Sequence, residues 1–398
     1  MRYFAAGLVC CNIMAALTAC SGDDDVYSLD YFYENYGKNG EDTVVVIPDT
    51  LSLAIVWNGS TATITGETDS VTIARGTNQS DVIITSTSNR YMEVTLSGQS
   101  TDGSLLVYSL KSWGLVMNDV YLNNADGPAI NNQCGKWLYV TLPEGTNNTL
   151  TDGSAWSDAP KNAQGDIIDQ KATLFSEGQI DFSGTGMLTV NGYAKNGIAS
   201  DDYIVLNGGN ININVAATGS NGLKVKDGFT MNDGTLTIDV KADGARGIRN
   251  EARTTISGGQ TTITTSGACK IETVDGVKDT TSCAGIKSDS LFTMTAGTLT
   301  ITSSGDGGKG IACSENVEVK GGTLTVNTTG SNNVGKPKGV KSDTGIIVSG
   351  GSFNVTVKKS WACDNGTDSE DPAERVTING TPAETPVLQK RLVKIRME

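Results

Sequence analysis

The hydrophobic and polar residues of this chain follow a pattern that is written six times within residues 196–358. Each copy opens with a glycine and an aliphatic residue, and a second glycine follows twelve positions after the first. The opening pairs are Gly197-Ile198, Gly222-Leu223, Gly247-Ile248, Gly285-Ile286, Gly310-Ile311 and Gly339-Val340; the second glycines are Gly209, Gly234, Gly259, Gly297, Gly322 and Gly351. Such regular self-similarity is typical of a repeat architecture.

Apolar and polar residues alternate inside each copy. Counted from the opening glycine, the first copy places Ile204, Leu206, Ile211 and Ile213 at offsets seven, nine, fourteen and sixteen, and the other copies are mostly apolar there too. A period of two predicts β-strands. Three short strands in about 25 residues cannot bury their apolar side alone, so each copy must stack on the next at about 4.8 Å. The pattern predicts an all-β parallel β-helix, a solenoid with three short strands per coil.

The flanks of the repeats set the expected boundaries. Short strand-like segments of the same texture begin near Thr43, so we expect the β-helix to span residues 43–361 as one elongated domain. Residues 152–170 break the pattern and are expected to form a loop. Residues 362–398 are expected to connect and cap the last coil, because an uncapped β-helix exposes unpaired strand edges.

Residues 1–42 are expected to direct and anchor the protein at its cellular location and not to form part of the β-helix. Residues 1–19 have the composition of a signal peptide, and their apolar run is too short for a stable transmembrane helix. Leu17-Thr18-Ala19-Cys20 resembles the lipobox of bacterial lipoproteins, in which the cysteine is acylated. Residues 20–42 would form an acidic tether whose Ser21-Gly22-Asp23-Asp24-Asp25 resembles the surface-export signal of Bacteroidetes lipoproteins. We expect a lipid-anchored protein of the outer membrane, on the cell surface or facing the periplasm.

Composition excludes several function classes. The net charge of −14 argues against a nucleic-acid partner, because a phosphate backbone would be repelled. The chain has no histidine, which removes His-based triads, imidazole metal ligands and His general bases. We expect a monomer.

A longer motif carries a family resemblance. Residues 142–154 read Leu-Pro-Glu-Gly-Thr-Asn-Asn-Thr-Leu-Thr-Asp-Gly-Ser, and Gly-aliphatic-Lys and Gly-Gly-x-Leu-x-Val elements follow them. Over roughly residues 103–360 the chain resembles the bacterial carbohydrate-binding domain-containing proteins. The resemblance implies a right-handed, single-stranded parallel β-helix related in fold to pectate lyases. It also implies binding of cellulose and acidic sugars, with calcium as a possible ligand.

The chain departs from that family at one position of each repeat. The family usually has Asp before the opening Gly-aliphatic pair, and here those positions hold Asn196, Asn221, Arg246, Ala284, Lys309 and Lys338. Amides and cations thus replace hard oxygen ligands of calcium. The sequence therefore assigns no metal ligands.

Alternation along the strands predicts a charged outer face. If offset one points inward, offsets two and four point outward and stack basic residues beside acidic ones. One interpretation is a solvated ladder of weak surface ion pairs. The other is a cationic stripe that binds an anionic polysaccharide. The candidate ligand-binding residues are Lys224, Arg246, Arg249, Lys287, Lys309, Lys338 and Lys341, together with Trp156.

Two further surface features could bind a glycan. Outward offsets thirteen and fifteen carry mainly Thr, Asn, Gln and Ser, a face that could hydrogen-bond a crystalline polymer or could reflect only the strand preference of threonine. Sugars could also stack on tryptophan, and Trp156 is expected to be exposed because it lies in the predicted loop. The other tryptophans are Trp57, Trp113, Trp137 and Trp361.

Cysteine usage suggests one structural bond. Cys269 and Cys283 bracket the insertion that lengthens one repeat, so a disulfide between them is expected in an extracytoplasmic compartment. Cys313 falls at an inward position and is expected to be a buried thiol.

Three functions remain open. The first is a cell-surface lipoprotein that binds an acidic or cellulose-like polysaccharide without catalysis. The second is a polysaccharide lyase that acts by β-elimination on uronates, with Lys224, Arg246, Arg249 or Lys287 as the base. The third is a rigid surface spacer or adhesin. Fold analogy does not choose among them.

Overall fold

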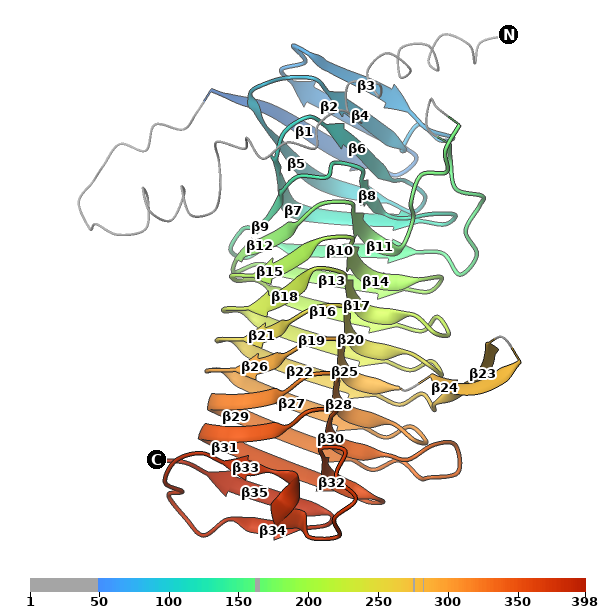
Figure 1. The fold of residues 1–398 in the computed structure, drawn as a ribbon. Coiled ribbons are helices and arrows are strands. Elements are labelled where there is room, and N and C mark those ends of the chain that lie inside the picture. Colours follow the sequence, from blue (N-terminus) through green and yellow to red (C-terminus); the bar gives the residue numbers. More distant parts are fainter. Residues whose placement is uncertain (1–48, 162–164, 275, 282) are drawn as a thin grey trace, which may run out of the picture.

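The computed structural model describes residues 49–161, 165–274, 276–281 and 283–398. Within these residues the chain winds into an elongated stack of coils with three strands per coil (Figure 1). The predicted fold class, an all-β parallel β-helix, is confirmed. The signal peptide, Cys20 and the tether of residues 20–42 lie outside the described residues. In the part that is described, no helix has the length and apolarity needed to cross a membrane.

One sheet forms a complete side of the solenoid. Its twelve strands follow one another in chain order, and all neighbours are parallel except the first pair. They are β3 (Val71–Arg75), β4 (Val82–Ser86), β6 (Leu105–Ser109), β8 (Ile130–Asn132), β11 (Ala172–Ser176), β14 (Asn196–Ser200), β17 (Asn221–Val225), β20 (Arg246–Asn250), β25 (Ala284–Ser288), β28 (Lys309–Cys313), β30 (Lys338–Ser342) and β32 (Trp361–Asp364).

The other two strands of each coil belong to one bent sheet. The middle strands are β9 (Leu138–Leu142), β12 (Ile180–Gly184), β15 (Tyr203–Leu206), β18 (Gly228–Met231), β21 (Thr254–Ile256) and β26 (Phe292–Met294). The third strands are β10 (Asn147–Asp152), β13 (Met187–Gly192), β16 (Asn210–Val215), β19 (Thr235–Val240), β22 (Gln260–Thr265) and β27 (Thr298–Ser303). In β5 (Tyr91–Ser100), β7 (Trp113–Asn124), β29 (Val317–Thr328) and β31 (Ile346–Val357) the two strands are continuous around the bend.

The glycines of the repeat mark the bend and the tightest packing. The second glycine of every copy has positive φ, for example +86° at Gly209 and +71° at Gly351, a conformation that other residues rarely adopt. The opening glycine allows a close approach instead. A Cβ on Gly222 would lie 2.4 Å from Ile238 Cγ2 and 2.6 Å from the carbonyl oxygen of Gly247. Both positions therefore favour glycine for reasons of geometry.

The core is built of columns of equivalent residues from successive coils. Ile238, Ile263 and Ile301 pair in register on β19, β22 and β27, and all three are fully buried. Other inward columns also hold buried polar residues. Thr254 and Asn250 hydrogen-bond each other, with Asn250 Nδ2 donating to Thr254 Oγ1 at 3.0 Å. The residues that the sequence predicted to point inward therefore stack in columns in the structure.

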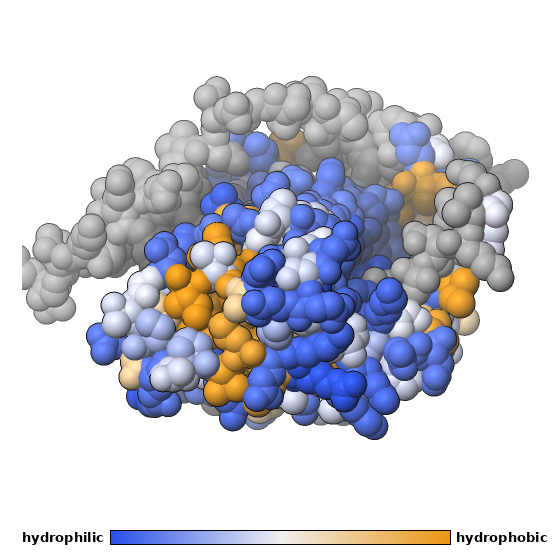
Figure 2. Space-filling view, turned by 60° about the horizontal axis from the view of Figure 1, so that its bottom comes forward, coloured by the Kyte–Doolittle hydropathy of each residue, from blue (hydrophilic) through white to orange (hydrophobic). Residues whose placement is uncertain are grey.

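Both ends of the solenoid are closed by antiparallel strands. At the start, β1 (Thr50–Asn58) pairs with β2 (Thr61–Gly66). At the end, the 3-10 helix η1 (Pro372–Arg375) and β33 (Thr377–Ile378) precede β34 (Val387–Gln389) and β35 (Leu392–Arg396), and β35 pairs antiparallel with β31. With this end turned forward, the surface is mostly hydrophilic around a band of hydrophobic side chains (Figure 2). A hairpin of β23 (Lys270–Val274) and β24 (Val277–Thr281) projects from the side of the stack (Figure 1).

Candidate functional site

The predicted basic column lies on the outer side of the twelve-stranded sheet. Lys224, Arg249 and Lys287 occupy equivalent positions on β17, β20 and β25, and Ala312 and Lys341 continue the column on β28 and β30. The basic side chains of this column are partly exposed, and Ala312 is buried. We call this outer side the charged face.

Each base of this column has an acidic partner. Lys287 Nζ lies 2.9 Å from Asp289 Oδ1, and Lys224 Nζ lies 4.0 Å from Glu251 Oε1. The remaining pairs are Arg249 with Asp289 and Lys341 with Asp343. Together Lys287 and Arg249 hold the pKa of Asp289 below its usual range despite its partial burial. The arrangement matches the ladder of surface ion pairs more closely than a stripe of free cations.

The corner beside this column holds Arg246, Lys309 and Lys338 in register. Burial lowers the pKa values of Arg246 and Lys309, and neighbouring cations lower them further. Lys338 is 8% exposed and its Nζ lies 2.5 Å from Asp364 Oδ2. Cations fill three of the six positions at which the resembling family has Asp, so the corner at Arg246, Lys309 and Lys338 does not fit calcium.

The two cysteines of the insertion are free thiols in the structure, where the sequence predicted a disulfide. Both are buried. The sulfur of Cys283 hydrogen-bonds to the carbonyl oxygens of Ala245 and Gly267, at 3.1 and 2.9 Å. This orientation points the thiol at the backbone, and burial raises its pKa to about 11. Cys313 is also buried and free.

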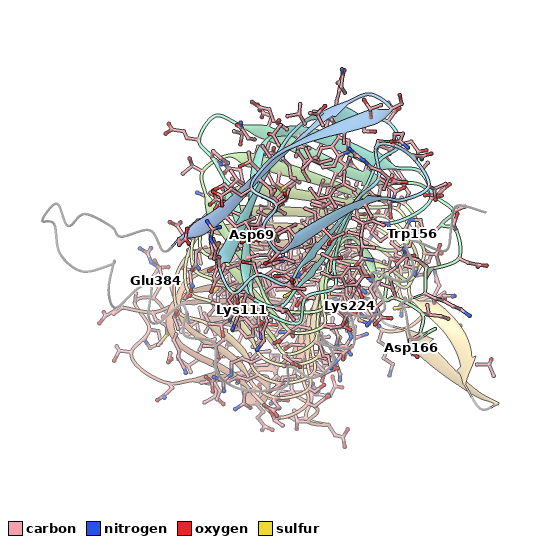
Figure 3. All side chains as sticks on the ribbon, turned by 90° about the horizontal axis from the view of Figure 1, so that it is seen from above. Asp69, Lys111, Trp156, Asp166, Lys224 and Glu384 are labelled. Carbon is pink, nitrogen blue, oxygen red and sulfur yellow. The ribbon has the colours of Figure 1, made fainter. Side chains whose placement is uncertain are left out.

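Trp156, which was expected to be exposed, is partly exposed, and a cation lies over its ring. The Nζ of Lys195 lies 4.7 Å from the centre of the Trp156 ring. The same Nζ donates a hydrogen bond to the carbonyl oxygen of Gln170, and the two contacts together hold the loop against the solenoid. The indole Nε1 is buried. Seen along the solenoid axis, Trp156, Asp166 and Lys224 lie on the same side of the molecule (Figure 3). Trp57, Trp113 and Trp361 are core residues, and Trp137 stacks on Tyr139 with ring centres 6.0 Å apart.

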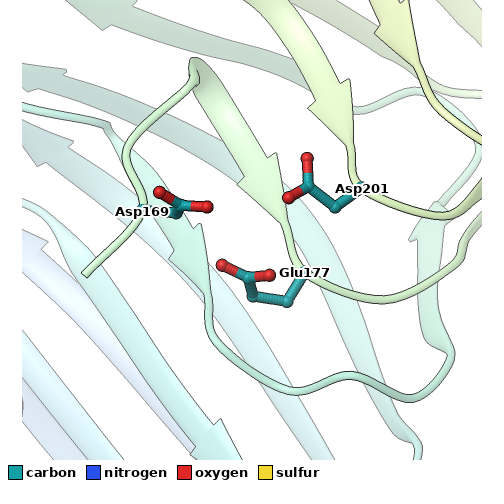
Figure 4. A group of neighbouring side chains, drawn as sticks. All are labelled: Asp169, Glu177 and Asp201. Atoms are coloured by element: carbon teal, nitrogen blue, oxygen red, sulfur yellow. The ribbon is translucent and has the colours of Figure 1, made fainter. Parts of the chain in front are cut away.

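The structure reveals an acidic group that the sequence analysis missed. Asp169, Glu177 and Asp201 offer carboxylate oxygens that all lie within 4.8 Å of one another (Figure 4). Burial, then the negative charges of Asp201 and Asp169, raise the pKa of Glu177 to about 7. Glu177 and Asp201 are equivalent residues of consecutive coils, so the repeat extended upstream by one coil would have found them. Asp169 comes from the irregular loop and gave no such signal.

Carboxylates are suitable calcium ligands, but this group already contains a cation. Lys171 Nζ lies 2.5 Å from Asp169 Oδ2 and also pairs with Asp201. An ammonium group between two of the three carboxylates supplies the positive charge that a metal would bring. We therefore assign no metal here.

The outer side of the third strands is a contrasting surface, which we call the uncharged face. On β10, β13, β16, β19, β22, β27, β29 and β31 the outward residues form three columns, and none of these side chains is buried. Asp239 is their one charged member. The columns are Asn147, Met187, Asn210, Thr235, Gln260, Thr298, Thr323 and Ser352; Thr149, Thr189, Asn212, Thr237, Thr262, Thr300, Thr325 and Asn354; and Thr151, Asn191, Asn214, Asp239, Thr264, Thr302, Asn327 and Thr356.

An exposed aromatic residue continues the central column toward the N-terminal end. Tyr121 pairs in register with Thr149 and with Gln99, and it is 56% exposed. It lies in a shallow depression with Gln99, Asn123, Thr149 and Thr151. A phenol ring beside hydroxyl and amide groups can stack on the C–H face of a sugar whose hydroxyls they bind.

Comparison with known proteins gives a family. The model of the carbohydrate-binding domain-containing protein family matches residues 78–246 and 244–332. The chain belongs to this family. The matched residues include the charged face from β4 to β28 and most of the uncharged face.

Two relatives illustrate the family. A carbohydrate-binding domain-containing protein of Acetivibrio thermocellus is 30% identical over 122 residues, which are 30% of this chain and 41% of that protein. The match thus spans less than half of the relative's length. A solved polysaccharide lyase-like protein from C. thermocellum, a gadolinium derivative, superposes with a TM-score of 0.52 at 24% identity, over 66% of this chain and 94% of that one. At 24% identity, this similarity is evidence for the fold alone.

Proposed function

We propose that this chain is a cell-surface lipoprotein that binds polysaccharide and does not cleave it. Membership of a carbohydrate-binding family supports the ligand class. The lipobox-like sequence before Cys20 supports the anchor. Catalysis finds little support on the charged face, because every basic residue of its column is engaged with a carboxylate.

The observation that carries the proposal is the uncharged face. A protein with a net charge of −14 exposes three long columns of side chains that are hydroxyls and amides except for Met187 and a single carboxylate, Asp239. Such groups donate and accept hydrogen bonds without the desolvation penalty of charges. A neutral polysaccharide, which presents many hydroxyls and no charge, is the polymer that this surface complements.

The spacing of the face suits an extended chain. Equivalent residues repeat at the strand spacing of about 4.8 Å, close to the length that one pyranose contributes to an extended β-linked polymer. A polymer that lies parallel to the solenoid axis would therefore meet the same three positions at each successive sugar. Tyr121 would contact the sugar at the N-terminal end of this track.

Retention on insoluble neutral and uronic polysaccharides tests the proposal. Thr262→Glu places a charge in the central column of the uncharged face and should reduce retention on neutral polymer on the order of tenfold, because it adds a carboxylate that must be desolvated. The matched control is Thr255→Glu, since Thr255 faces outward on β21 of the same coil but on the neighbouring side. Equal retention of the two variants would count against the uncharged face as the site.

A second candidate is an acidic polysaccharide on the charged face. The specific observation in its favour is the register of Lys224, Arg249 and Lys287, with Arg246 and Lys309 at the adjoining corner. This places five basic residues close together on a protein whose net charge is −14. Uronate carboxylates could replace the protein's own carboxylates as partners, and such binding would weaken as salt rises.

The same retention assay separates the alternatives. Unsaturated uronide absorbance in the tubes with uronic polymer would identify a lyase. Absence of retention on every polysaccharide would favour a rigid spacer.

A further inference from the structure

A separate depression lies at the N-terminal end of the twelve-stranded sheet, on its outer side. Its floor is apolar: Ile83 on β4 and Leu106 on β6 pair in register and are both partly exposed. Asn131 on β8 continues this column toward Lys224. These three strands are the earliest parallel strands of the sheet, so the depression is far along the axis from Lys224 and its neighbours.

Three turns wall the depression, and hydrogen bonds hold each of them. Asp81 accepts from Ser104 Oγ at 2.9 Å and from the backbone N–H of Asn78 at 2.8 Å. In the second turn, Asn124 Nδ2 donates to the carbonyl oxygen of Pro128 at 2.8 Å. The irregular loop forms the third wall, where Ser157 N–H donates to the carbonyl oxygen of Asp126 at 2.9 Å. The cavity is therefore preformed rather than dependent on a ligand.

The long loop between β10 and β11 forms one wall of the depression. Residues 153–161 and 165–171 interrupt the coils between β10 and β11, and Ser157, Asp158, Pro160 and Gln170 all line the depression. Without this loop, the outer side of the sheet at Ile83 and Leu106 would be open on that flank. Long loops on a rigid scaffold are common places for binding residues.

The lining selects the chemistry of a ligand. Carboxylates of Asp81, Asp126 and Asp158 stand around the apolar floor, while no lysine or arginine is among the described residues that line it. Carboxylates accept hydrogen bonds from vicinal hydroxyls and repel anions. The floor can contact the C–H face of a pyranose ring. A uronate, sulfated or phosphorylated sugar would meet only negative charge.

A metal site explains the depression less well. The three aspartates are not among the described residues whose ligand atoms gather within 4.8 Å of one another. Moreover, both oxygens of Asp81 already accept hydrogen bonds from the protein.

We infer that this depression binds a single uncharged or amino-bearing pyranose residue, as the end or a side branch of a glycan. The inference rests on the proposed function only in taking carbohydrate as the ligand. The depression would be a second site, which binds one sugar in a pocket, whereas the uncharged face would contact many sugars along a flat surface.

Ligand-observed NMR on the full-length chain in detergent tests the inference. The probes are methyl glycosides of glucose, galactose and mannose, free glucosamine, and galacturonic acid. We expect saturation transfer to at least one of the neutral or amino probes and none to galacturonic acid. Leu106→Trp, which fills the floor, should abolish the transfer. Asp158→Asn should weaken binding on the order of tenfold, because it replaces a charged acceptor.

The controls separate loss of the site from loss of the fold. Asp158 is exposed, so its variant should fold normally, and Asp69→Asn is a matched exposed change in a turn outside the lining. Transfer that is absent for every neutral and amino probe, or that persists unchanged in Leu106→Trp, would overturn the inference. Polymer retention by Leu106→Trp reports on the proposed function independently. Failure of one proposal therefore leaves the other standing.

Discussion

Arg375 stacks its guanidinium group on the indole of Trp361, with the guanidinium carbon 3.7 Å from the ring centre. Arg375 is 4% exposed, and its Nη1 also lies 3.0 Å from Asp364 Oδ1. Because Asp364 pairs with Lys338 as well, one carboxylate joins the last coil to the C-terminal cap. The contact between Arg375 and Trp361 therefore connects the cap to the end of the solenoid.

Arg375→Ala should destabilise the protein by roughly 2–4 kcal/mol, because it breaks a buried ion pair and a cation–π contact. Denaturant unfolding measures the change. The matched control is Arg396→Ala, since Arg396 pairs with Glu384 at the surface and both side chains are mostly exposed. That control should change the free energy of unfolding by less than about 1 kcal/mol. Similar losses in the two variants would mean that the cap contact is not special.

Ile263→Asp should destabilise the protein by roughly 3 kcal/mol or more, because it buries a carboxylate between Ile238 and Ile301 without a partner. The neighbouring outward variant Thr262→Asp should leave the melting temperature nearly unchanged. Thermal unfolding of both variants provides the measurement. An unchanged melting temperature for Ile263→Asp would contradict the register of these coils.

Asp181 should make the protein less stable as pH rises. It is 5% exposed, and burial raises its pKa to about 6, although Asn207 donates to both of its oxygens. The folded state thus binds a proton more tightly than the unfolded state, so stability is lost between about pH 4 and pH 6 and stays low above that range.

Asp181→Asn removes that loss and should raise the free energy of unfolding at pH 8 by about 1–3 kcal/mol. At pH 4 the variant and the parent should differ little. Urea unfolding at the two pH values checks this. A gain of equal size at both values would point to packing instead of ionisation.

Arg249→Gln combined with Lys287→Gln tests the acidic-polysaccharide candidate. The double variant should lower retention on polygalacturonate, and the parent's retention should fall as salt shortens the Debye length below about 10 Å. Stability should change little, because these ion pairs lie partly exposed at the surface, where a pair contributes about 0–1 kcal/mol. If retention on the uronic polymer is insensitive both to salt and to the double change, the charged face is only an ion-pair ladder.

Cys20→Ala tests the anchor. Without the thiol that would carry the lipid, the chain should remain unprocessed or become soluble. Fractionation of cells and protease treatment of intact cells measure the outcome. A wild-type protein that is membrane-bound but protected from external protease would place it on the periplasmic side.

The repeat made most of the fold predictable from the sequence. Equivalent positions in successive coils must stack, so the columns through Ile263 and through Arg249 could be written down from spacing alone. The ion-pair partners of the side chains in a column were harder to predict. Which carboxylate pairs with which base depends on side-chain rotamers, and both Arg249 and Lys287 turned to Asp289.

Features built by irregular segments could not be predicted. The group around Glu177 needs Asp169, and the cover over Trp156 needs Lys195 and the backbone of Gln170. Those contacts depend on the path of a long loop, and the loop sequence has no hydrophobic periodicity from which that path could be predicted. The depression over Ile83 was missed for the same reason, because one of its walls is that loop.

The equal spacing of the coils has a consequence for the way a polymer would stay bound. Each coil of the uncharged face offers nearly the same groups, so a bound chain shifted by one coil meets an equivalent set of partners. The many degenerate registers add a favourable statistical term to binding, while the small contribution of each sugar keeps the barrier between registers low. A polymer held in this way would be retained for long periods and yet remain free to slide along the protein.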